Sequence, residues 1–328
     1  MKNELQMPVL AIDIGGTKIA AAVIYGDGEV GAKARDHSPE TDDDVVLVDA
    51  VERVARHALG SSGLQIHDMG GVGVSCAGII NVRDGIVVSS PNVVSLRRTP
   101  LQAMLHERFG VSVRLANDAT LAALGEWEFG LHRAVQDIVY VTASTGIGGG
   151  IIAGGRLIEG SCGAGGEVGH MTIDVNGPEC PCGRFGCWEA LGSGRALAER
   201  TVSRIEAGEP SIIGELAGGD MSNVDAQLVS IAARHGDGLA REMIRMTAFY
   251  LGVGLGNLIN IFNPSVLVLG GGLTKIGEAL LEPAEKEARE RAYVTSACDV
   301  DIIAARLGDD SPLLGAAVLV RGNATPEV

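Results

Sequence analysis

The chain has 328 residues, which is enough for two domains with separate hydrophobic cores. Hydrophobic residues make up 46% of the sequence and charged residues 20%, a balance typical of a soluble globular protein. The net charge of −15 argues against a nucleic-acid partner, because phosphate binding needs clustered lysine and arginine side chains.

Cysteine usage favours a reducing compartment. Three of the six cysteines lie close together and the others are isolated, so a disulfide framework is not indicated: Cys180, Cys182 and Cys187 against Cys76, Cys162 and Cys298. No charged segment followed by an apolar one opens the chain. The apolar run at 249–262 is too short to span a bilayer. We therefore expect a cytoplasmic protein with no membrane partner.

The first predicted unit of structure is a hairpin. Two apolar runs, at 9–14 and 19–24, flank the turn Gly15-Gly16-Thr17-Lys18, which favours two buried strands. Backbone N–H groups in such a turn can hold phosphate, and Thr17 adds a hydroxyl. Asp13, at the end of the first strand, could hold Mg²⁺ through water. Purely structural turns of this type are more common than phosphate sites.

A similar unit follows about 130 residues later. An apolar strand at 138–141 leads into the glycine-rich turn 144–150, and apolar residues continue at 151–152 and 157–158. This internal duplication predicts two like domains that face each other across a cleft. The Walker pattern GxxxxGK[ST] is absent, so the phosphate-binding device is a different one.

The segments between the two hairpins alternate between helix and strand. We predict helices at 48–59, 101–109 and 119–128, and strands at 71–75, 85–88 and 111–115. Asn117 and Asp118 stand at a strand end and a helix start at once. Since Asn and Asp are preferred N-caps, capping is slightly favoured over catalysis from these two residues alone.

A metal-binding pattern follows the second hairpin. His170, Cys180, Cys182 and Cys187 have the residue types and spacing of a closed, structural Zn²⁺ site, with glycines between the last two cysteines for tight turns. The alternative is a cluster of small buried thiols. Glu167 and Glu189 bracket this cluster, and a zinc ion would hold both in fixed positions.

The last third of the chain is mostly helical. We predict helices at 194–207, 225–235, 238–262, 276–291 and 311–321, the last capped by Ser311, and strands at 266–269 and 300–304. Asn263-Pro264 ends the third of these helices. Three glycines inside that helix, at 252, 254 and 256, indicate close packing against another backbone. The turn Gly270-Gly271-Gly272 could admit a flat nucleotide.

Together these motifs resemble the ROK family (repressor, open reading frame, kinase) along essentially the whole chain, and the ATP-dependent glucokinases of that family most of all. The similar segments occur in the same order: Asp13-Ile-Gly-Gly-Thr-Lys18, Asn117-Asp118, Thr145-Gly-Ile-Gly148, Glu167-Val-Gly-His170, the segment from Cys180 to Glu189, and Gly270-Gly-Gly272. Ala143 departs from the family pattern, which prefers a larger aliphatic residue there.

The resemblance implies an actin-like ATPase fold with two α/β domains around a central cleft. We expect a small domain of residues 1–117 with the C-terminal helix at about 311–328, and a large domain of residues 118–310 that carries the zinc site. Asp118 matches the family's catalytic base. Sugar-binding positions would be Gly78, Asn92, Asn117, Asp118, Glu167, His170 and Glu189. Nucleotide-binding positions would be Asp13, Gly15, Gly16, Thr17, Lys18, Thr145, Gly146, Gly148, Gly270, Gly271 and Gly272.

The implied activity is ATP-dependent phosphorylation of a hexose, with glucose as the first expectation, Mg²⁺ accompanying ATP, and a structural Zn²⁺. Alternatives are N-acetylhexosamine kinases and fructokinases of the same family, or a non-catalytic sugar-responsive regulator. Glu167 favours a glucose-like sugar over N-acetylmannosamine, whereas residues 91–96 differ from the common glucokinase pattern. Regulators of the family carry a helix-turn-helix domain before the first hairpin, where only eight residues stand here. We expect a homodimer or homotetramer.

Overall fold

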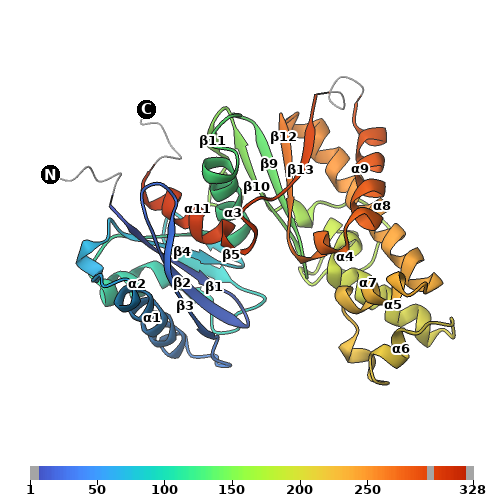
Figure 1. The fold of residues 1–328 in the computed structure, drawn as a ribbon, viewed down its shortest axis with the longest axis horizontal. Helices are drawn as coiled ribbons and strands as arrows, with labels where there is room; N and C mark the ends of the chain where they lie inside the picture. The colour runs from blue at the N-terminus through green and yellow to red at the C-terminus, as the bar shows by residue number, and fades with distance from the viewer. Residues whose placement is uncertain (1–6, 294–298, 323–328) are drawn as a thin grey trace. The chain divides into compact units, whose positions relative to one another are not determined.

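The computed structural model describes residues 7–293 and 299–322. Contacts between residues divide the chain into two compact units, each built from more than one segment. Unit 1 comprises Met1–Gln136, Gly150–Gly166 and Arg306–Val328, and unit 2 comprises Asp137–Gly149 and Glu167–Ala305. Figure 1 traces the chain and labels its elements.

The main sheet of unit 1 has the strand order β3-β2-β1-β4-β8. The hairpin that the sequence predicts is present: β1 (Val9–Ile14) pairs antiparallel with β2 (Lys18–Ile24). On the other side of β1, β4 (Val72–Cys76) and β8 (Val113–Asn117) continue the sheet in parallel. The sequence does not predict the edge strand β3 (Val30–His37), because this strand has no run of buried apolar side chains.

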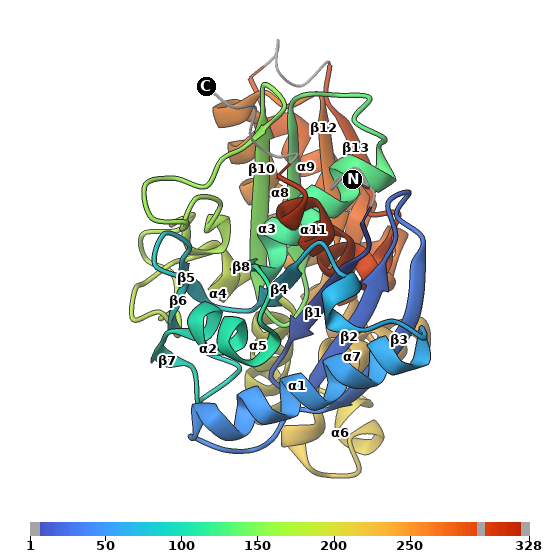
Figure 2. The ribbon, with the colours of Figure 1, turned by 90° about the vertical axis from the view of Figure 1, so that its left-hand side faces the viewer.

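Four helices cover the two faces of this sheet. Helices α1 (Asp44–Ser61) and α2 (Leu101–Phe109) lie on one face, and α3 (Asp118–Gly125) and α11 (Ser311–Val320) on the other (Figure 1). Figure 2 shows α1 crossing the strands β1 to β3. Helix α3 continues as the π-helical turn η3 (Glu126–Gly130). The predicted helices at 48–59 and 101–109 are therefore confirmed, and the buried face of each is apolar.

A second, three-stranded sheet in unit 1 consists of β5 (Ile79–Asn81), β6 (Ile86–Ser89) and β7 (Arg97–Thr99). Only β6 is predicted from sequence, since strands of three residues give no readable alternation of apolar and polar side chains. Two short 3₁₀ turns, η2 (Ile66–Asp68) and η7 (Gly308–Asp310), also belong to unit 1.

The sheet that forms the base of unit 2 has the order β11-β10-β9-β12-β13, with β12 parallel to both β9 and β13. Its turn is shorter than the sequence predicts, because β10 begins at Ile147 and only residues 144–146 separate it from β9. By their contacts, the end of β10 and all of β11 belong to unit 1. The strands are β9 (Ile138–Ala143), β10 (Ile147–Ala153), β11 (Arg156–Leu157), β12 (Val266–Gly270) and β13 (Asp301–Ala304).

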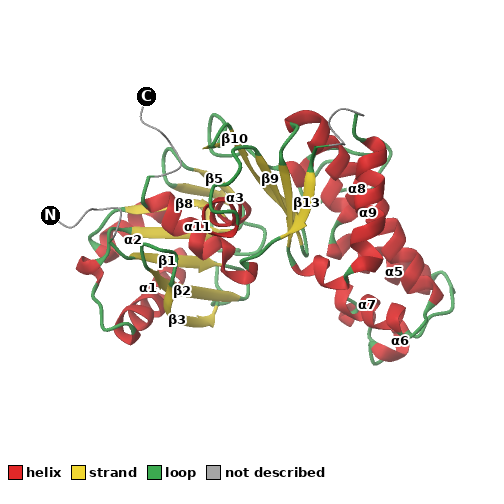
Figure 3. Ribbon diagram, turned by 45° about the horizontal axis from the view of Figure 1, so that its top comes forward, coloured by secondary structure: helices red, strands yellow, loops and turns green. Residues whose placement is uncertain are grey.

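The helices of unit 2 gather on one side of this sheet (Figure 3). Each long helix that the sequence predicts in this region is present, within three residues at either end. The helices are α4 (Trp188–Gly192), α5 (Gly194–Glu206), α6 (Ile213–Leu216), α7 (Ala226–Arg234), α8 (Gly238–Phe262) and α9 (Glu278–Arg291), with 3₁₀ turns η4 (Val168–His170), η5 (Met221–Asn223) and η6 (Gly272–Ile276).

The glycines inside α8 permit close packing, as the sequence predicts. A Cβ at Gly252 would lie 2.6 Å from the backbone oxygen of Ala284 on α9, and one at Gly254 only 2.0 Å from the indole of Trp188. The helix ends at Asn263, whose φ of +43° starts the turn into Pro264. Among the described residues, no helix is both long and apolar enough to cross a membrane.

Two expectations at the boundary between the units need correction. The sequence assigns helix α3 to the second domain, whereas its contacts place it in unit 1, where it packs on α11: a Cβ at Gly315 would lie 1.7 Å from the Leu121 backbone oxygen. Ser311 does not cap α11. Its hydroxyl instead donates to the buried carboxylate of Glu126, and Asp310 is the residue at the N-cap. Residues 323–328 of the expected C-terminal helix lie outside the described residues.

Candidate functional site

The ends of β1, β4 and β8 bring several predicted site residues to one edge of the unit 1 sheet. Asp13 pairs with Ser75 in register, and Cys76 pairs with both Ile14 and Asn117. The Ser75 hydroxyl donates to Asp13 Oδ1 at 2.6 Å. Burial raises the pKa of Asp13, although the Ser75 hydrogen bond and the charge of Lys18 oppose this shift. The carboxylate is thus fixed at the start of the glycine turn.

The β1–β2 turn is tightly closed. The Gly15 N–H donates to the Lys18 carbonyl at 3.0 Å, while Gly16, Thr17 and Lys18 are exposed. A Cβ at Gly16 would lie 2.4 Å from the backbone oxygen of Asn92. An exposed glycine turn of this kind is suited to an anion, and its position depends on the loop that carries Asn92.

Asn117 and Asp118 have different local roles. Asn117 caps α3, since its Oδ1 accepts from Ala119 N at 2.9 Å and its Nδ2 donates to the Gly78 carbonyl at 3.0 Å. Asp118 is the first residue of the helix, and its Oδ1 accepts from Ala119 N at 2.9 Å. The capping expected from sequence therefore belongs mainly to Asn117. Asp118 lies at a helix N-terminus, where the helix dipole stabilises a negative charge.

Cys76 shows that both acids lie near one point. After burial, the main causes that raise the pKa of the Cys76 thiol are the negative charges of Asp118 and Asp13. Gly78 follows two residues later with φ +125°, and a Cβ there would lie 2.3 Å from the Ser89 backbone oxygen. A glycine is required at this position.

In unit 2 the β9–β10 turn is held by the start of α5. The backbone N–H groups of Gly194 and Arg195 donate to the carbonyls of Ser144 and Thr145, at 2.8 and 3.2 Å. Gly146 faces Glu189, so that a Cβ there would lie 2.3 Å from Glu189 Oε2. This turn is therefore fixed on both sides.

Two predicted sugar-binding acids lie close together in unit 2. Burial raises the pKa of Glu167, the charge of His170 opposes the shift, and the charge of Glu189 adds to it. Glu189 Oε2 accepts from the Ile147 N–H at 2.9 Å, and its Oε1 lies 3.2 Å from Arg195 Nη2. Glu189 is thus an oriented carboxylate with hydrogen-bonding capacity to spare.

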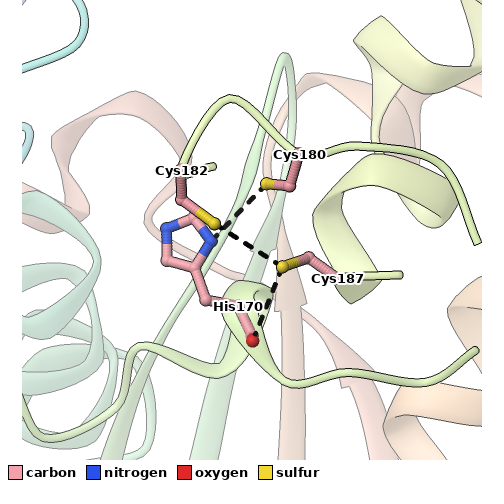
Figure 4. A group of neighbouring side chains, drawn as sticks. All are labelled: His170, Cys180, Cys182 and Cys187. Atoms are coloured by element: carbon pink, nitrogen blue, oxygen red, sulfur yellow. Dashed lines mark hydrogen bonds between the residues drawn. The ribbon is translucent and has the colours of Figure 1, made fainter. Parts of the chain in front are cut away.

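The four residues expected to bind zinc come together (Figure 4). The ligand atoms of His170, Cys180, Cys182 and Cys187 all lie within 4.8 Å of one another. The Cys182 and Cys187 sulfurs are 3.6 Å apart, and His170 Nδ1 lies 3.8 Å from the Cys180 sulfur. Tetrahedral sulfur ligands, each about 2.3 Å from zinc, would stand about 3.8 Å apart. The donor set and its spacing therefore fit the ion.

The remaining cysteines are not part of this cluster. Cys76 is buried in unit 1 and Cys162 is exposed. Cys298 lies outside the described residues. Gly183 and Gly186 lie in tight turns, as the sequence predicts, with φ values of +81° and +68°.

A cavity of about 1020 Å³ lies within unit 2, between the β9–β10 turn, α5, α7, η5 and η6. Of the predicted nucleotide-binding residues, Thr145 and Gly272 line it. Gly146, Gly148, Gly270 and Gly271 do not line it. Gly271 instead permits a close backbone approach, since it has φ +90° and a Cβ there would lie 2.3 Å from the Ala143 backbone oxygen.

The sequence does not predict two residues that contact candidate acids, one in each unit. Ser75 fixes Asp13, and Arg195 contacts Glu189 and lines the cavity. Neither stands in a motif, and their partners lie 62 and 6 positions away along the chain. Only the fold brings them to the site.

The chain is similar to known proteins over nearly its whole length. The ROK family matches residues 9–323. The chain is 35% identical over 316 residues to a glucokinase from Streptomyces coelicolor, covering 95% of this chain and 97% of that protein. It is also 35% identical over 320 residues to an N-acetylmannosamine kinase from Escherichia coli, covering 96% and 99%. A crystal structure of a ROK family glucokinase from Streptomyces griseus in complex with glucose and AMPPNP is similar with a TM-score of 0.82 and 33% identity, covering 96% of this chain and 99% of that one.

This similarity extends from β1 to the end of α11 and includes both α/β units. The expected actin-like ATPase fold is thereby confirmed. On the match over nearly its whole length, the chain belongs to the ROK family.

Proposed function

We propose that this protein is an ATP-dependent hexose kinase that transfers the γ-phosphoryl group to a sugar hydroxyl, with glucose 6-phosphate as the expected product. One strand edge in unit 1 carries the proposal. There the end of β8 leads directly into Asp118, and in-register pairing through Cys76 connects it with the end of β1 and its glycine turn. A carboxylate and a phosphate-binding turn thus share one edge. The likeness to kinases of hexoses and N-acetylhexosamines supports the same reading.

In this mechanism Asp118 is the general base. It accepts the proton of the sugar hydroxyl while that oxygen forms a bond to the γ-phosphorus, and the bond from the γ-phosphorus to the β–γ bridging oxygen breaks to release ADP. Asp118 is the first residue of α3, where the helix dipole favours a negative charge. Mg²⁺ bound with ATP would neutralise phosphate charge. Asp13, fixed by Ser75, is suited to hold that hydrated ion through water.

We assign sugar binding in unit 2 to Glu167, His170 and Glu189, whose carboxylate and imidazole groups suit adjacent hydroxyls. In unit 1 we retain Gly78, Asn92 and Asn117. The cavity in unit 2 is the proposed place of the nucleotide's adenosine part, with Thr145 and Gly272 on its wall. The glycine turns would hold the phosphates.

We propose a structural zinc ion on His170, Cys180, Cys182 and Cys187. Four ligands leave no open position, so the ion would stabilise the fold of this segment and would not take part in the reaction. It would orient His170 and Glu189, which lie on or next to the cluster.

The acceptor sugar is the least constrained part of the proposal. The two relatives named above act on different sugars by name and have the same identity to this chain. An ADP-release assay with glucose, N-acetylglucosamine, N-acetylmannosamine, mannose and fructose separates the candidates. A kcat/KM for glucose at least about tenfold above the others supports glucokinase activity, and preference for another sugar replaces it with that substrate. No turnover with any of them, in the presence of ATP and Mg²⁺, would leave a non-catalytic regulator.

A further inference from the structure

Arg195 completes a closed set of hydrogen bonds that joins the β9–β10 turn to Glu189. Its backbone N–H donates to the Thr145 carbonyl at 3.2 Å, and its Nη2 lies 3.2 Å from Glu189 Oε1. The other oxygen of Glu189 accepts from the N–H of Ile147, at 2.9 Å. Thr145, Gly146 and Ile147 are consecutive, so the turn, the carboxylate and the arginine form one ring.

We propose that Arg195 is a positioning residue that fixes the Glu189 carboxylate for the sugar and makes its position depend on the β9–β10 turn beside the nucleotide cavity. This inference rests on the proposed function, because it takes Glu189 as a sugar ligand. Arg195 itself does not need to touch the sugar.

The local helix does not explain the arginine. Arg195 stands in the first turn of α5, directly after the N-cap Ser193 and Gly194, and a positive charge at a helix N-terminus is unfavourable. A second acid, Glu199, lies one turn along the same helix, but its oxygen is 3.9 Å away and its side chain is 71% exposed. Glu189 is nearer, and its side chain is only 17% exposed. The geometry therefore favours a specific role at Glu189.

The pair also gives Glu189 a defined orientation. Each carboxylate oxygen accepts one hydrogen bond from the protein and keeps further lone pairs, so it can accept a sugar hydroxyl from a fixed direction. Loss of Arg195 would remove the hydrogen bond to Oε1, so the carboxylate would keep its bond from the Ile147 N–H and gain rotational freedom about its terminal torsion. The expected consequence is weaker sugar binding with chemistry largely preserved once the sugar is bound.

The same arginine lies on the wall of the cavity, next to Thr145. A nucleotide that contacts the turn or the Arg195 side chain would therefore change the orientation of the Glu189 carboxylate. Coupling of this kind is reciprocal, so the sugar should alter nucleotide affinity by the same factor as the nucleotide alters sugar affinity.

The test compares Arg195→Gln and Arg195→Lys with the wild-type protein in steady-state kinetics. We expect Arg195→Gln to raise the KM for the sugar about tenfold with kcat changed less than about threefold, the pattern of lost uniform binding. Arg195→Lys should recover part of the affinity, because it restores the charge without the planar fork. The control is Arg204→Gln on the same helix, whose side chain is 35% exposed and pairs with Glu209 and Glu242 away from the cavity; it should behave as wild type.

A double-mutant cycle shows whether Arg195 acts through Glu189. The variant Arg195→Gln/Glu189→Gln should bind sugar no more weakly than Glu189→Gln alone. Additive losses overturn the proposal, as does an unchanged sugar KM, or a rise confined to the KM for ATP. If the wild type phosphorylates none of the sugars above, the kinase proposal itself fails and this inference fails with it.

The coupling is measured as the ratio of sugar dissociation constants without and with ADP. In the wild type we expect a ratio of at least about fivefold, and in Arg195→Gln a ratio close to one, with Arg204→Gln unchanged. A ratio that is the same in wild type and Arg195→Gln would contradict the dependence on the turn.

Discussion

Gly146 and Glu189 are in contact across the β9–β10 turn: a Cβ at Gly146 would lie 2.3 Å from Glu189 Oε2. The first turn has a similar contact, since a Cβ at Gly16 would lie 2.4 Å from the Asn92 backbone oxygen. In each unit a glycine assigned to phosphate thus touches a residue assigned to sugar. Because glycine has no side chain, each turn leaves room both for the phosphate assigned to it and for the neighbouring residue assigned to the sugar.

This contact changes the result expected for Gly146. If the turn contacted phosphate alone, a bulky residue there would weaken ATP binding and leave sugar affinity nearly unchanged. The structure instead predicts that Gly146→Ala, which must displace the Glu189 carboxylate, raises the KM for the sugar at least about tenfold in addition to its effect on ATP. Gly238→Ala is the control, because a Cβ at Gly238 meets nothing within 4 Å. Sugar affinity that is unchanged in Gly146→Ala would show that Glu189 can move without consequence.

Asp118→Asn tests the general base. The substitution keeps the shape of the side chain, and Asn117 remains the cap of α3, so folding and ATP binding should persist. Loss of a general base typically lowers kcat by about 10²–10⁴-fold. Turnover is measured by ADP release at saturating sugar, with circular dichroism and ATP titration as controls for folding. A variant that keeps more than about a tenth of the wild-type kcat would show that Asp118 is not the base.

Asp13 provides a prediction about stability and pH. Burial raises the folded-state pKa of this carboxyl, so its ionised form costs stability at pH values above that pKa, and the cost disappears as the pH falls through it. Asp13→Asn removes the charge but keeps an oxygen for the Ser75 hydroxyl. Without ATP or Mg²⁺, we expect Asp13→Asn to raise Tm by a few degrees at about pH 8 and by less at about pH 5.

The control for this measurement is Asp42→Asn, which changes an exposed carboxylate and should leave Tm nearly the same. Asp13→Asn should also impair turnover if Asp13 holds hydrated Mg²⁺. A lower Tm at both pH values would mean that the ionised carboxylate stabilises the folded state, contrary to its raised pKa.

Local signals predict much of this fold because they are strong. Long helices such as α8 show a helical pattern with a clear end at Asn263-Pro264, and β1, β9 and β12 are continuous apolar runs. The short strands β5 and β7 and the exposed edge strand β3 lack such signals. They form because neighbouring strands offer hydrogen bonds, which is a tertiary effect.

The residues of the candidate site also differ in whether a local sequence signal predicts them. Residues within a motif, such as His170 and the three cysteines, are predictable because their chemistry and spacing are local. Arg195 and Ser75 are not, since only the folded chain shows that they contact acids of the site. Ser311 illustrates the opposite error: a good capping residue by type is used for the buried carboxylate of Glu126.

The proposed zinc site leads first to a prediction about the metal content of the protein. Protein purified without added zinc should contain one Zn²⁺ per chain by elemental analysis. Cys182→Ser replaces a thiolate with a poor ligand, so it should lose the metal and lower Tm. The matched control is Cys162→Ser, which changes an exposed cysteine outside the cluster and should retain both.

Metal loss should also weaken sugar binding, although residue 182 need not touch the sugar. Glu167 lies three residues before the proposed ligand His170, and Glu189 lies two residues after the proposed ligand Cys187, so the ion would restrain the backbone on which both acids stand. We expect the KM for the sugar to rise at least about tenfold and the KM for ATP to change less, because the cavity is lined by α5, α7 and the β9–β10 turn. Wild-type protein without zinc would refute the metal site. A zinc-free Cys182→Ser protein with wild-type sugar affinity would separate the metal from the substrate. The acids would then be held by protein contacts such as those of Glu189 with Ile147 and Arg195.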